Sequence, residues 1–458
     1  MSPRITMALA VIVALVAAYI FAVDRPMAQR AEQAKHLIQL SKDQITGVTL
    51  DSAKGRVELA RRDATHWELT QPVQVPAASF SVSDLLDALT GLVPQRTLGG
   101  AGSDLSSYGL DRPVAQVTLR ASGGRTVTLQ VGKPSPVATA VYARLVPGSS
   151  VYLLDSSIKD TLSKSATDLR QKTLADFANA DVQKVRITSS KGLLVVDRLG
   201  ADRWRIEGPR AWPADDFKVT DLFFPLTTSE AKKFHDGVAG PATYGLDRPA
   251  VTMELVLRGR AEPLTALITR RGKVAYAMIA GTHTVLELDP SVEAKLAPDP
   301  IQLVSQRVLP YNAQDLTAVV WRRGGRSLEI RRQGPGFTGG GLSDKDISDM
   351  FSSVNILDAE KVEPLVSPPS GPAAFEIQTD GAADARFLVA FYREPKGGWL
   401  AIDRALGLQY RLSANALDGF PQAIKTFVGI APPKTAAPAA PKTKPPAPAK
   451  PSPSHQGK

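Results

Sequence analysis

The sequence predicts an α+β fold: tandem repeats of a mainly antiparallel β-sheet module with one or two packed helices, preceded by one transmembrane helix. Three observations support this prediction. The hexapeptide Tyr-Gly-Leu-Asp-Arg-Pro occurs at 108–113 and again at 244–249, within similar surroundings. Segments such as 126–131 alternate apolar and polar residues, which is the period of half-buried strands. Residues 5–23 form an apolar run without a charge.

The apolar run predicts a membrane anchor. As a helix, its residues would extend about 28 Å, close to the hydrocarbon thickness of a bilayer. We therefore expect a short cytoplasmic tail at 1–4, a transmembrane helix at 5–23 and a linker at 24–43. A cleaved signal peptide remains the alternative, although the run is long and lacks a clear small-x-small site before the charged residues.

The orientation of this anchor follows from size more than from charge. Arg25, Arg30 and Lys35 follow the run, so the local charge does not favour export of the bulk. Large domains translocate largely regardless of such charges, and a very short N-terminal tail usually stays inside. We expect a single-pass protein of the inner membrane, with its N-terminus in the cytoplasm and its bulk in the periplasm.

The second copy of the hexapeptide begins 136 residues after the first, and other landmarks repeat in the same order. The pair Trp67/Leu69 recurs as Trp204/Ile206, and Phe80 recurs as Phe217. These matches predict repeat domains at 44–173 and 174–307. A third, degenerate domain is predicted at 308–430, where the segments 316–319, 327–330, 399–402 and 408–412 resemble strands of the first two copies.

Helical periodicity marks one main helix in each copy. In the first copy the apolar residues of 82–93 follow the 3.6-residue spacing, and Ser81 with Asp84 resembles a capping box. Ser343 and Asp346 open the equivalent segment of the third copy. In the second copy, Pro225 should shorten or kink the helix. A second, shorter helix is expected near 158–162, 292–296 and 416–420.

The repeated hexapeptide is interpreted as a structural turn, with a binding loop as the alternative. Gly permits a positive φ, Asp can bond the following backbone, Pro fixes φ before the next strand, and Tyr and Leu would anchor the turn in the core. Trp67 and Trp204 occupy equivalent strand positions and are predicted to be buried, whereas Trp212, Trp321 and Trp399 are less constrained and could be exposed. The motif residues are Tyr108, Gly109, Leu110, Asp111, Pro113, Tyr244, Gly245, Leu246, Asp247 and Pro249.

The residue types that carry catalysis form no recognisable set. The chain has no cysteine, which excludes disulfides, thiolate nucleophiles and sulfur-ligated zinc. Its five histidines have no helical metal-ligand spacing, and neither a nucleophile elbow nor a phosphate-binding glycine motif is present. We therefore expect no catalytic, metal or cofactor site and predict that the protein is not an enzyme.

The net charge of +10 is concentrated at the C-terminus. Residues 431–458 carry five lysines and no acid, so the rest of the chain is only mildly basic and does not predict nucleic-acid binding. This Pro/Ala/Lys-rich tail cannot form a core and is predicted to be disordered. It is either a solvated terminus or a contact for an anionic polymer or lipid through Lys434, Lys442, Lys444 and Lys450.

Together, these residues resemble the bacterial family known as domain of unknown function 4340. The resemblance rests on Trp67-Glu-Leu69, the 108–113 hexapeptide, Val131-Gly-Lys133 with Tyr142-Ala-Arg144, and Leu169-Arg170 with Leu174. The second copy departs from it at 269–272, and the third copy matches poorly. The family has no established activity, but its association with ABC-type transporters implies a membrane-protein complex as partner.

Three hypotheses for function follow. The first is a non-enzymatic, membrane-anchored extracytoplasmic scaffold or accessory subunit of an envelope transport or assembly complex of the ABC type. The second is an envelope module that binds polysaccharide or peptidoglycan through the repeats and the basic tail. The third, a hydrolase of unrecognised type, is the least favoured.

Overall fold

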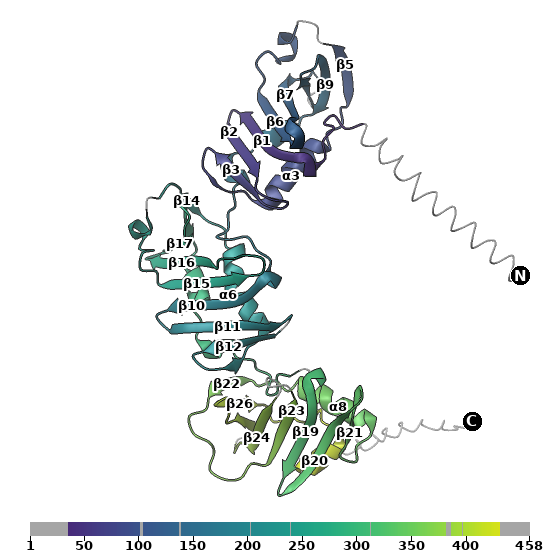
Figure 1. The fold of residues 1–458 in the computed structure, drawn as a ribbon, viewed down its shortest axis with the longest axis vertical. Coiled ribbons are helices and arrows are strands. Elements are labelled where there is room, and N and C mark those ends of the chain that lie inside the picture. The colour runs from purple at the N-terminus through teal and green to yellow at the C-terminus, as the bar shows by residue number, and fades with distance from the viewer. Residues whose placement is uncertain are drawn as a thin grey trace, which may run out of the picture. The chain divides into compact units, whose positions relative to one another are not determined.

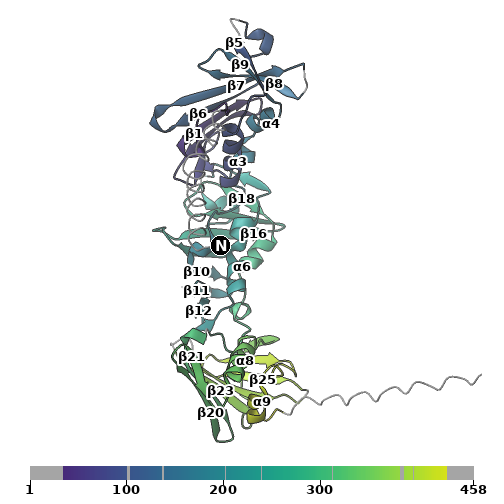
Figure 2. The ribbon, with the colours of Figure 1, turned by 90° about the vertical axis from the view of Figure 1, so that its right-hand side faces the viewer.

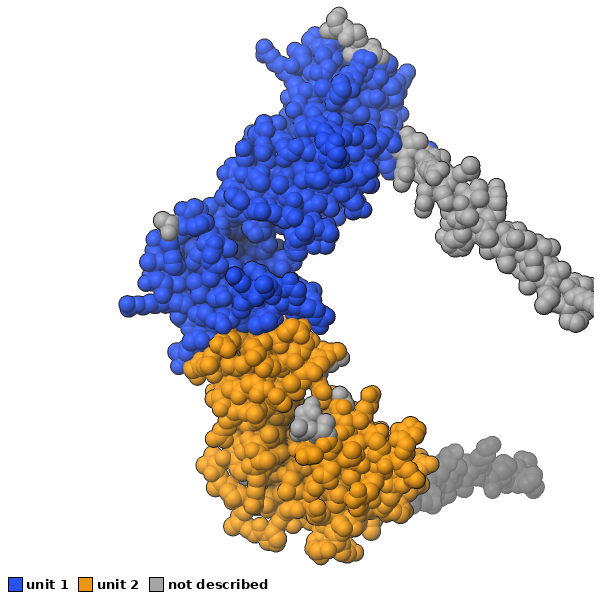
Figure 3. Space-filling model, viewed as in Figure 1, with its two compact units in different colours: residues 1–181, 187–190, 223–297 blue, residues 182–186, 191–222, 298–458 orange. Residues whose placement is uncertain are grey.

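The computed structural model describes residues 35–430 except 101–103, 137–138, 202, 239, 312, 382–385 and 396. The predicted cytoplasmic tail, the transmembrane helix 5–23, most of the linker 24–43 and the tail 431–458 lie outside the described residues. By compactness the chain divides into two units, one of residues 1–181, 187–190 and 223–297 and one of residues 182–186, 191–222 and 298–458 (Figure 3). Within the described ranges, no helix is both long and apolar enough to cross a membrane.

Three antiparallel sheets follow one another along the chain, and we call each sheet with its helices a module (Figure 1). Module 1 contains α3 (Ser79–Thr90), α4 (Ile158–Leu162) and α5 (Ala166–Leu169). Its strands are β1 (Ile45–Ser52), β2 (Gly55–Arg61), β3 (Trp67–Gln71), β4 (Val75–Pro76), β5 (Arg96–Gly100), β6 (Ala115–Ala121), β7 (Thr126–Pro134), β8 (Ala140–Val146) and β9 (Ser150–Asp155).

Module 2 contains α6 (Asp216–Thr228) and α7 (Ser291–Leu296). Its strands are β10 (Val182–Ser189), β11 (Gly192–Gly200), β12 (Arg203–Gly208), β13 (Trp212–Pro213), β14 (Lys233–His235), β15 (Val251–Leu257), β16 (Leu264–Arg271), β17 (Val274–Ile279) and β18 (Val285–Leu288). The boundary between the two compact units passes through this module.

Module 3 contains α8 (Asp344–Asn355) and α9 (Gln422–Val428). Its strands are β19 (Leu316–Arg323), β20 (Arg326–Gln333), β21 (Gly336–Gly339), β22 (Lys361–Pro364), β23 (Phe375–Gly381), β24 (Phe387–Arg393), β25 (Trp399–Asp403) and β26 (Leu408–Leu412). Short 3-10 turns occur at η2 (Lys42–Gln44), η3 (Ser106–Tyr108), η4 (Ser122–Gly124), η5 (Asn179–Asp181), η6 (Pro241–Tyr244), η7 (Pro300–Leu303) and η8 (Ala313–Asp315).

The modules share one topology. The strand order β4-β3-β2-β1-β6-β7-β8-β9-β5 of module 1 recurs in module 2 as β13-β12-β11-β10-β15-β16-β17-β18-β14. Module 3 has the order β21-β20-β19-β23-β24-β25-β26-β22 and so lacks a counterpart of the short strands β4 and β13. The prediction of an α+β fold built from repeated, mainly antiparallel modules is therefore confirmed.

The core of module 1 lies between the sheet and its helices. In Figure 2, α3 and α4 lie on the same side of the strands β1 and β6. Val82, Leu85, Leu86 and Leu89 of α3 are buried against apolar residues of the sheet, among them Leu69. Because the side chains of a strand alternate between its two faces, Trp67 and Leu69 both point into this core.

Three details of the helix prediction are wrong, and one of the two alternatives for α6 is ruled out. Helix α3 begins at Ser79, after Ala78, so Ser81 and Asp84 form no capping box, and the helix ends at Thr90, which leaves Val93 exposed. Helix α6 continues through Pro225 to Thr228, so of the predicted shortening or kink the shortening does not occur. The last helix of module 3 spans 422–428, and 416–420 is a turn. By contrast, the Oγ of Ser343 accepts a hydrogen bond from the Asp346 amide and caps α8 as predicted.

Candidate functional site

The repeated hexapeptide forms a turn that is anchored by its Tyr and Leu. The ring of Tyr108 packs edge-to-face on Tyr142 of β8, with 4.9 Å between centroids. In module 2 the equivalent rings of Tyr244 and Tyr276 are 5.2 Å apart. The Leu of each copy is 1% exposed. These contacts fix the turn against the outer face of the sheet in both modules.

The glycines of this turn allow backbone to approach backbone. Gly109 and Gly245 have φ values of 68° and 76°. Residues with a Cβ adopt this left-handed conformation only with backbone strain. A Cβ on Gly132 would lie 2.2 Å from the carbonyl oxygen of Tyr108. The Val131-Gly-Lys133 element and the hexapeptide therefore occur together because one makes room for the other.

Module 2 lacks that glycine and solves the same problem differently. Arg271 donates from Nη1 to the carbonyl of Thr243 at 3.2 Å. Its Nη2 would lie 2.6 Å from a Cβ placed on Gly245. The departure of 269–272 from the family pattern thus replaces a backbone contact under the turn with an arginine side chain.

The Asp and Arg of the hexapeptide make no such contacts. Asp111, Arg112, Asp247 and Arg248 are all exposed. None of the four side chains forms a hydrogen bond or an ion pair with a residue in the described part of the chain. The expectation that Asp bonds the following backbone is therefore wrong for both copies. The turn's conformation depends on its other members.

A pocket of about 680 Å³ lies where module 1 is followed by module 2, within the first compact unit. Trp67, Ala77 and His66 line it from module 1, and Phe234 and His283 line it from module 2. We call residues 170–176, which connect the two modules, linker 1; all of them except Lys172 line the pocket. Linker 1 makes an isolated bridge to Ala77 through Arg170.

Arg170 is the central polar residue of this pocket wall. Its guanidinium makes two hydrogen bonds of 2.8 Å to Asp236 and stacks on the ring of Phe234 at 3.7 Å. The Arg170 side chain is 7% exposed and that of Asp236 is 29% exposed. Hydrogen bonding from Arg170 lowers the pKa of Asp236, and burial opposes this effect. The carboxylate is therefore held ionised as part of a structural ion pair.

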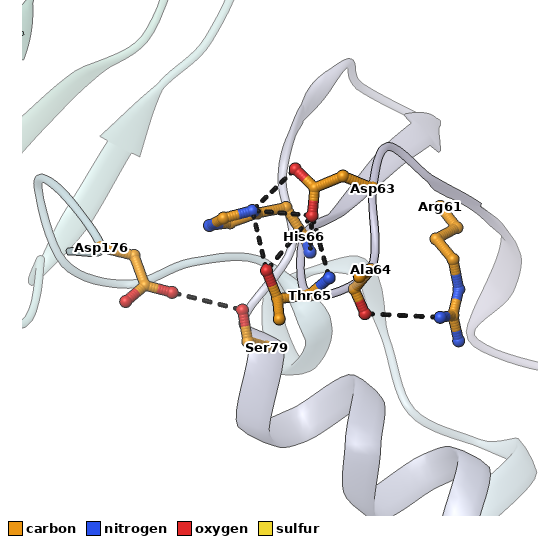
Figure 4. A network of polar contacts seen from close by, with 7 residues as sticks. All are labelled: Arg61, Asp63, Ala64, Thr65, His66, Ser79 and Asp176. Carbon is orange, nitrogen blue, oxygen red and sulfur yellow. Dashed lines mark hydrogen bonds and ion pairs between the residues drawn. The ribbon is translucent and has the colours of Figure 1, made fainter. Parts of the chain in front are cut away.

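Figure 4 shows the polar contacts at the rim of this pocket. Asp63 accepts hydrogen bonds from the amides of Thr65 and His66, both 2.9 Å long, and lies 2.9 Å from Nδ1 of His66. The two amides, followed by the imidazole, lower the pKa of Asp63. Ser79, at the start of α3, donates to Asp176 at 3.2 Å. Both members of the Asp63–His66 pair are more than half exposed, so these contacts belong to a solvated turn.

A second pocket, of about 500 Å³, lies where module 2 is followed by module 3, within the second compact unit. Trp204, Trp212 and Phe217 of module 2 line it together with Tyr311. We call the connecting residues 304–311 linker 2. The Nε1 of Trp212 donates to the carbonyl of Leu406 at 2.8 Å, which ties module 2 to a turn of module 3.

The two pockets are built from equivalent positions. Trp67 and Trp204 line them from the same strand position, and Ala77 and Ala214 line them from the residue after β4 and β13. Ala214 makes an isolated bridge to Val304, as Ala77 does to Arg170. The repeat therefore creates a hollow at each junction, but the polar lining differs because Val304 stands where Arg170 would be.

The predicted site residues fall into three groups. Trp67 and Trp204 are buried, as predicted. Trp212, Trp321 and Trp399 are 5%, 0% and 2% exposed, so the expectation that they could be exposed is wrong. The lysines of 431–458 lie outside the described residues. Across the described ranges, no group of three or more His, Asp or Glu side chains could hold a metal ion.

The junction residues were not identified from the sequence. Arg170 appeared there only as part of the Leu169-Arg170 element of the family resemblance. Its partner Asp236 is 66 residues away and belongs to the next module, so neither spacing nor periodicity could pair them. The resemblance itself was the one available signal.

Comparison with known proteins gives a family and little else. The family model described as domain of unknown function 4340 matches residues 67–249 and 204–368. Both matches begin at the equivalent tryptophans, so the family pattern starts inside one module and runs into the next. No curated protein matches the chain.

Similar solved structures include a putative DNA polymerase III β subunit from Eubacterium rectale and a DNA polymerase sliding clamp from Pseudomonas aeruginosa. The first is 10% identical, covers 83% of this chain and 94% of its own, and has a TM-score of 0.17. The second is 7% identical, covers 84% and 95%, and has a TM-score of 0.15. At these TM-scores the similarities support no conclusion about fold or function.

Proposed function

The chain belongs to the family described as domain of unknown function 4340, and from this premise we propose that it is a non-enzymatic, membrane-anchored scaffold or accessory subunit of an envelope transport or assembly complex. In this proposal residues 5–23 cross the inner membrane once and the modules lie in the periplasm. The uncharged apolar run supports the anchor, and the large size of the modules that follow it supports their export, because large domains translocate largely regardless of flanking charge.

The observation that carries the scaffold role is the way the modules are joined. In linker 1, the amide of Gln171 donates to Pro76 of module 1 at 2.9 Å, and the carbonyl of Lys172 accepts from Ala231 of module 2 at 2.8 Å. Adjacent residues of one linker are thus bonded to both neighbours. Such a connection limits hinge motion, because each bond holds its residue to one module and only the few torsions between Gln171 N and Lys172 O are left free to rotate.

Linker 2 repeats these bonds. The amide of Ser305 donates to Pro213 at 3.0 Å, and the carbonyl of Gln306 accepts from Ala359 at 2.8 Å. An enzyme that closes on its substrate needs a hinge at some junction. A scaffold that presents several surfaces at fixed spacing needs junctions with little hinge motion. The backbone bonds of both linkers fit this requirement.

Co-purification tests this function. The full-length protein is crosslinked in intact membranes, solubilised in detergent and purified, and its partners are quantified by mass spectrometry. A control fuses residues 1–43 to an unrelated domain and passes through the same steps. We expect a discrete membrane-protein partner with the full chain only. Recovery of the same abundant bystanders with both proteins would contradict the proposal.

The junction pockets favour a second candidate, an envelope module that binds polysaccharide or peptidoglycan. Their aromatic and polar side chains are the kinds that contact such polymers. A pulldown of the detergent-solubilised protein on purified cell wall, with and without residues 431–458, tests this candidate. If only the form with the tail is retained, the lysines of the tail bind the wall. If neither form is retained, the candidate is excluded.

A further inference from the structure

We propose that the exposed Asp–Arg pairs of the two hexapeptide turns, Asp111/Arg112 and Asp247/Arg248, are contact points for a partner protein that presents carboxylates. This inference rests on the proposed scaffold function and names the surface through which it acts. Both turns lie within the first compact unit.

Folding accounts for only part of the hexapeptide. Tyr packs on a second Tyr, Gly adopts a positive φ, and Leu is buried, in both copies. Pro precedes the next strand, where its fixed φ is suited to the turn. The Asp and Arg side chains have no partner among the described residues of either module. Many other residue pairs would satisfy the turn at these two positions.

The Asp–Arg pair is nevertheless identical in both copies, while its neighbours have changed. The residue immediately before the hexapeptide is Ser107 in the first copy and Thr243 in the second. The residue immediately after it is Val114 in the first copy and Ala250 in the second. The residue that lies against the turn glycine also differs: it is Lys133 in module 1 and, one position further along its strand, Arg271 in module 2. Identity at two exposed positions without a packing role, inside diverged surroundings, indicates a constraint from outside the chain.

The charge of each turn decides the partner's chemistry. The first turn exposes Asp111, Arg112 and Lys133, and the second exposes Asp247, Arg248 and Arg271. Lys133 is attracted by the carboxylate of Asp104, and Arg271 donates to the carbonyl of Thr243, so in each turn the arginine of the pair is the cation without a contact among the described residues. An arginine guanidinium binds a carboxylate through two parallel hydrogen bonds, which gives direction as well as attraction. The complementary surface is an acidic protein loop that also offers one donor to the Asp.

Module 3 provides an internal contrast. The equivalent stretch there is Pro368-Pro-Ser-Gly-Pro372, which has no Asp–Arg pair. Loss of the pair accompanies loss of the rest of the motif, so the inferred contacts belong to modules 1 and 2 alone.

Site-specific photocrosslinking in the full-length, membrane-bound protein tests the inference. The photoreactive residue p-benzoylphenylalanine replaces Val114 or Ala250, each of which is exposed beside a pair. Each form is compared with one in which the adjacent pair is exchanged, Asp111→Arg with Arg112→Asp or Asp247→Arg with Arg248→Asp. Because the exchange preserves net charge and breaks no described contact, the thermal midpoint should not change, and a melt of each variant checks this.

The matched control exchanges another exposed pair of opposite charges, Arg258→Glu with Glu262→Arg, in the β15–β16 turn. We expect a discrete protein product at both positions, reduced about tenfold by the adjacent exchange and unchanged by the control, since loss of one charged hot spot is worth roughly that factor. Raising the salt concentration should reduce the product of the unexchanged form in the same way.

Three outcomes would overturn the inference: a product whose yield the adjacent exchange leaves unchanged, a product that lysozyme digests, which would identify a cell-wall polymer, or no product at either position. The scaffold function fails separately, when the full chain co-purifies with no partner. A partner that co-purifies with both exchanged variants would leave that function standing and remove this surface from it.

Discussion

At the scale of single residues, the clearest result is that two glycines account for the joint occurrence of two sequence elements. Gly109 supplies the positive φ of the turn, and Gly132 leaves room for the carbonyl of Tyr108. The sequence predicted the first role, because a Gly between two large side chains in a turn is typical of a positive φ. It could not predict the second, since the two backbones approach only in the folded sheet.

Replacing Gly132 with Ala should destabilise module 1. Its Cβ would lie 2.2 Å from the Tyr108 carbonyl oxygen, so the turn must shift, at a cost of about 1–3 kcal/mol. Urea unfolding followed by tryptophan fluorescence measures the change. The control is Gly336→Ala, where a Cβ meets nothing within 4 Å. Equal stability of the two variants would show that the backbone contact is not tight.

Asp403, in contrast to Gly132, is a residue whose replacement should raise the stability of its module. It is 1% exposed, its Oδ1 accepts from the amide of Leu406 at 2.9 Å, and burial raises its pKa. A raised pKa means that the native state holds its proton more tightly than the unfolded state. The associated stability is present below the ordinary pKa of Asp and is lost as the pH rises through the raised value.

Asp403→Asn should therefore stabilise module 3 at pH 7, since the amide oxygen can still accept from Leu406 without a buried charge. We expect an increase of a few degrees, about 2–4 °C, in the thermal midpoint of the protein at pH 7, and almost none at pH 3. Midpoints measured across this range check the sign. A lower midpoint for the variant at pH 7 would mean that the carboxylate has a further stabilising contact.

At the scale of elements, the helices show where periodicity suffices. Helix α8 follows from Ser343, Asp346 and its apolar spacing, because a side-chain cap fixes the starting residue. Helix α3 has no side-chain cap hydrogen bond, so the pattern placed its face correctly but not its first residue. Helix α6 continues past Pro225, and its proline did not mark an end. Apolar faces were thus easier to predict than boundaries.

The junctions depend on linkers, and in linker 1 the largely buried Arg170 makes two 2.8 Å hydrogen bonds to Asp236. Removing one partner with Asp236→Ala leaves a buried guanidinium unpaired and should cost about 3 kcal/mol. The double variant Arg170→Met with Asp236→Ala should recover much of this loss, because no charge is left buried. Urea unfolding of the two variants and the wild type measures the loss of stability in Asp236→Ala and its recovery in the double variant.

The same pair predicts a dependence on pH. The pKa of Asp236 is lowered, so its contribution to stability is present above the ordinary Asp value and is lost as the pH falls through the lowered one. Wild-type stability should decrease on acidification more steeply than that of the double variant. Parallel slopes for the two proteins would show that the ion pair does not couple to folding.

At the scale of the whole molecule, internal repetition was the most informative signal in the sequence. The hexapeptide and the paired tryptophans predicted modules of one kind, and the shared strand order confirms this. The junction pockets could not be predicted, because each combines residues from two modules and no sequence pattern shows which residues of one module contact the next. The loss of a β4 or β13 counterpart in module 3 was likewise not visible, since a strand of two residues leaves no periodicity.

The predicted topology can be tested on the intact chain. Fusion of an alkaline phosphatase, which is active only in the periplasm, after residue 430 should give full activity, and a fusion of a fluorescent protein that matures only in the cytoplasm should give none. The reverse pattern would place the modules in the cytoplasm. Deleting residues 5–23 from the first fusion is the control, because export should then fail.

The matching bonds of the two linkers have a consequence for engineering. The amides of Gln171 and Ser305 each donate to the module before their linker. The carbonyls of Lys172 and Gln306 each accept from the module after it. Splicing Gln171 directly to Gln306, with Arg170→Val to match Val304 because Asp236 is removed, would therefore excise the middle repeat as a cassette and leave both cut ends with their original backbone bonds. By the same logic, further cassettes could be inserted, so that the length of the array becomes an adjustable property.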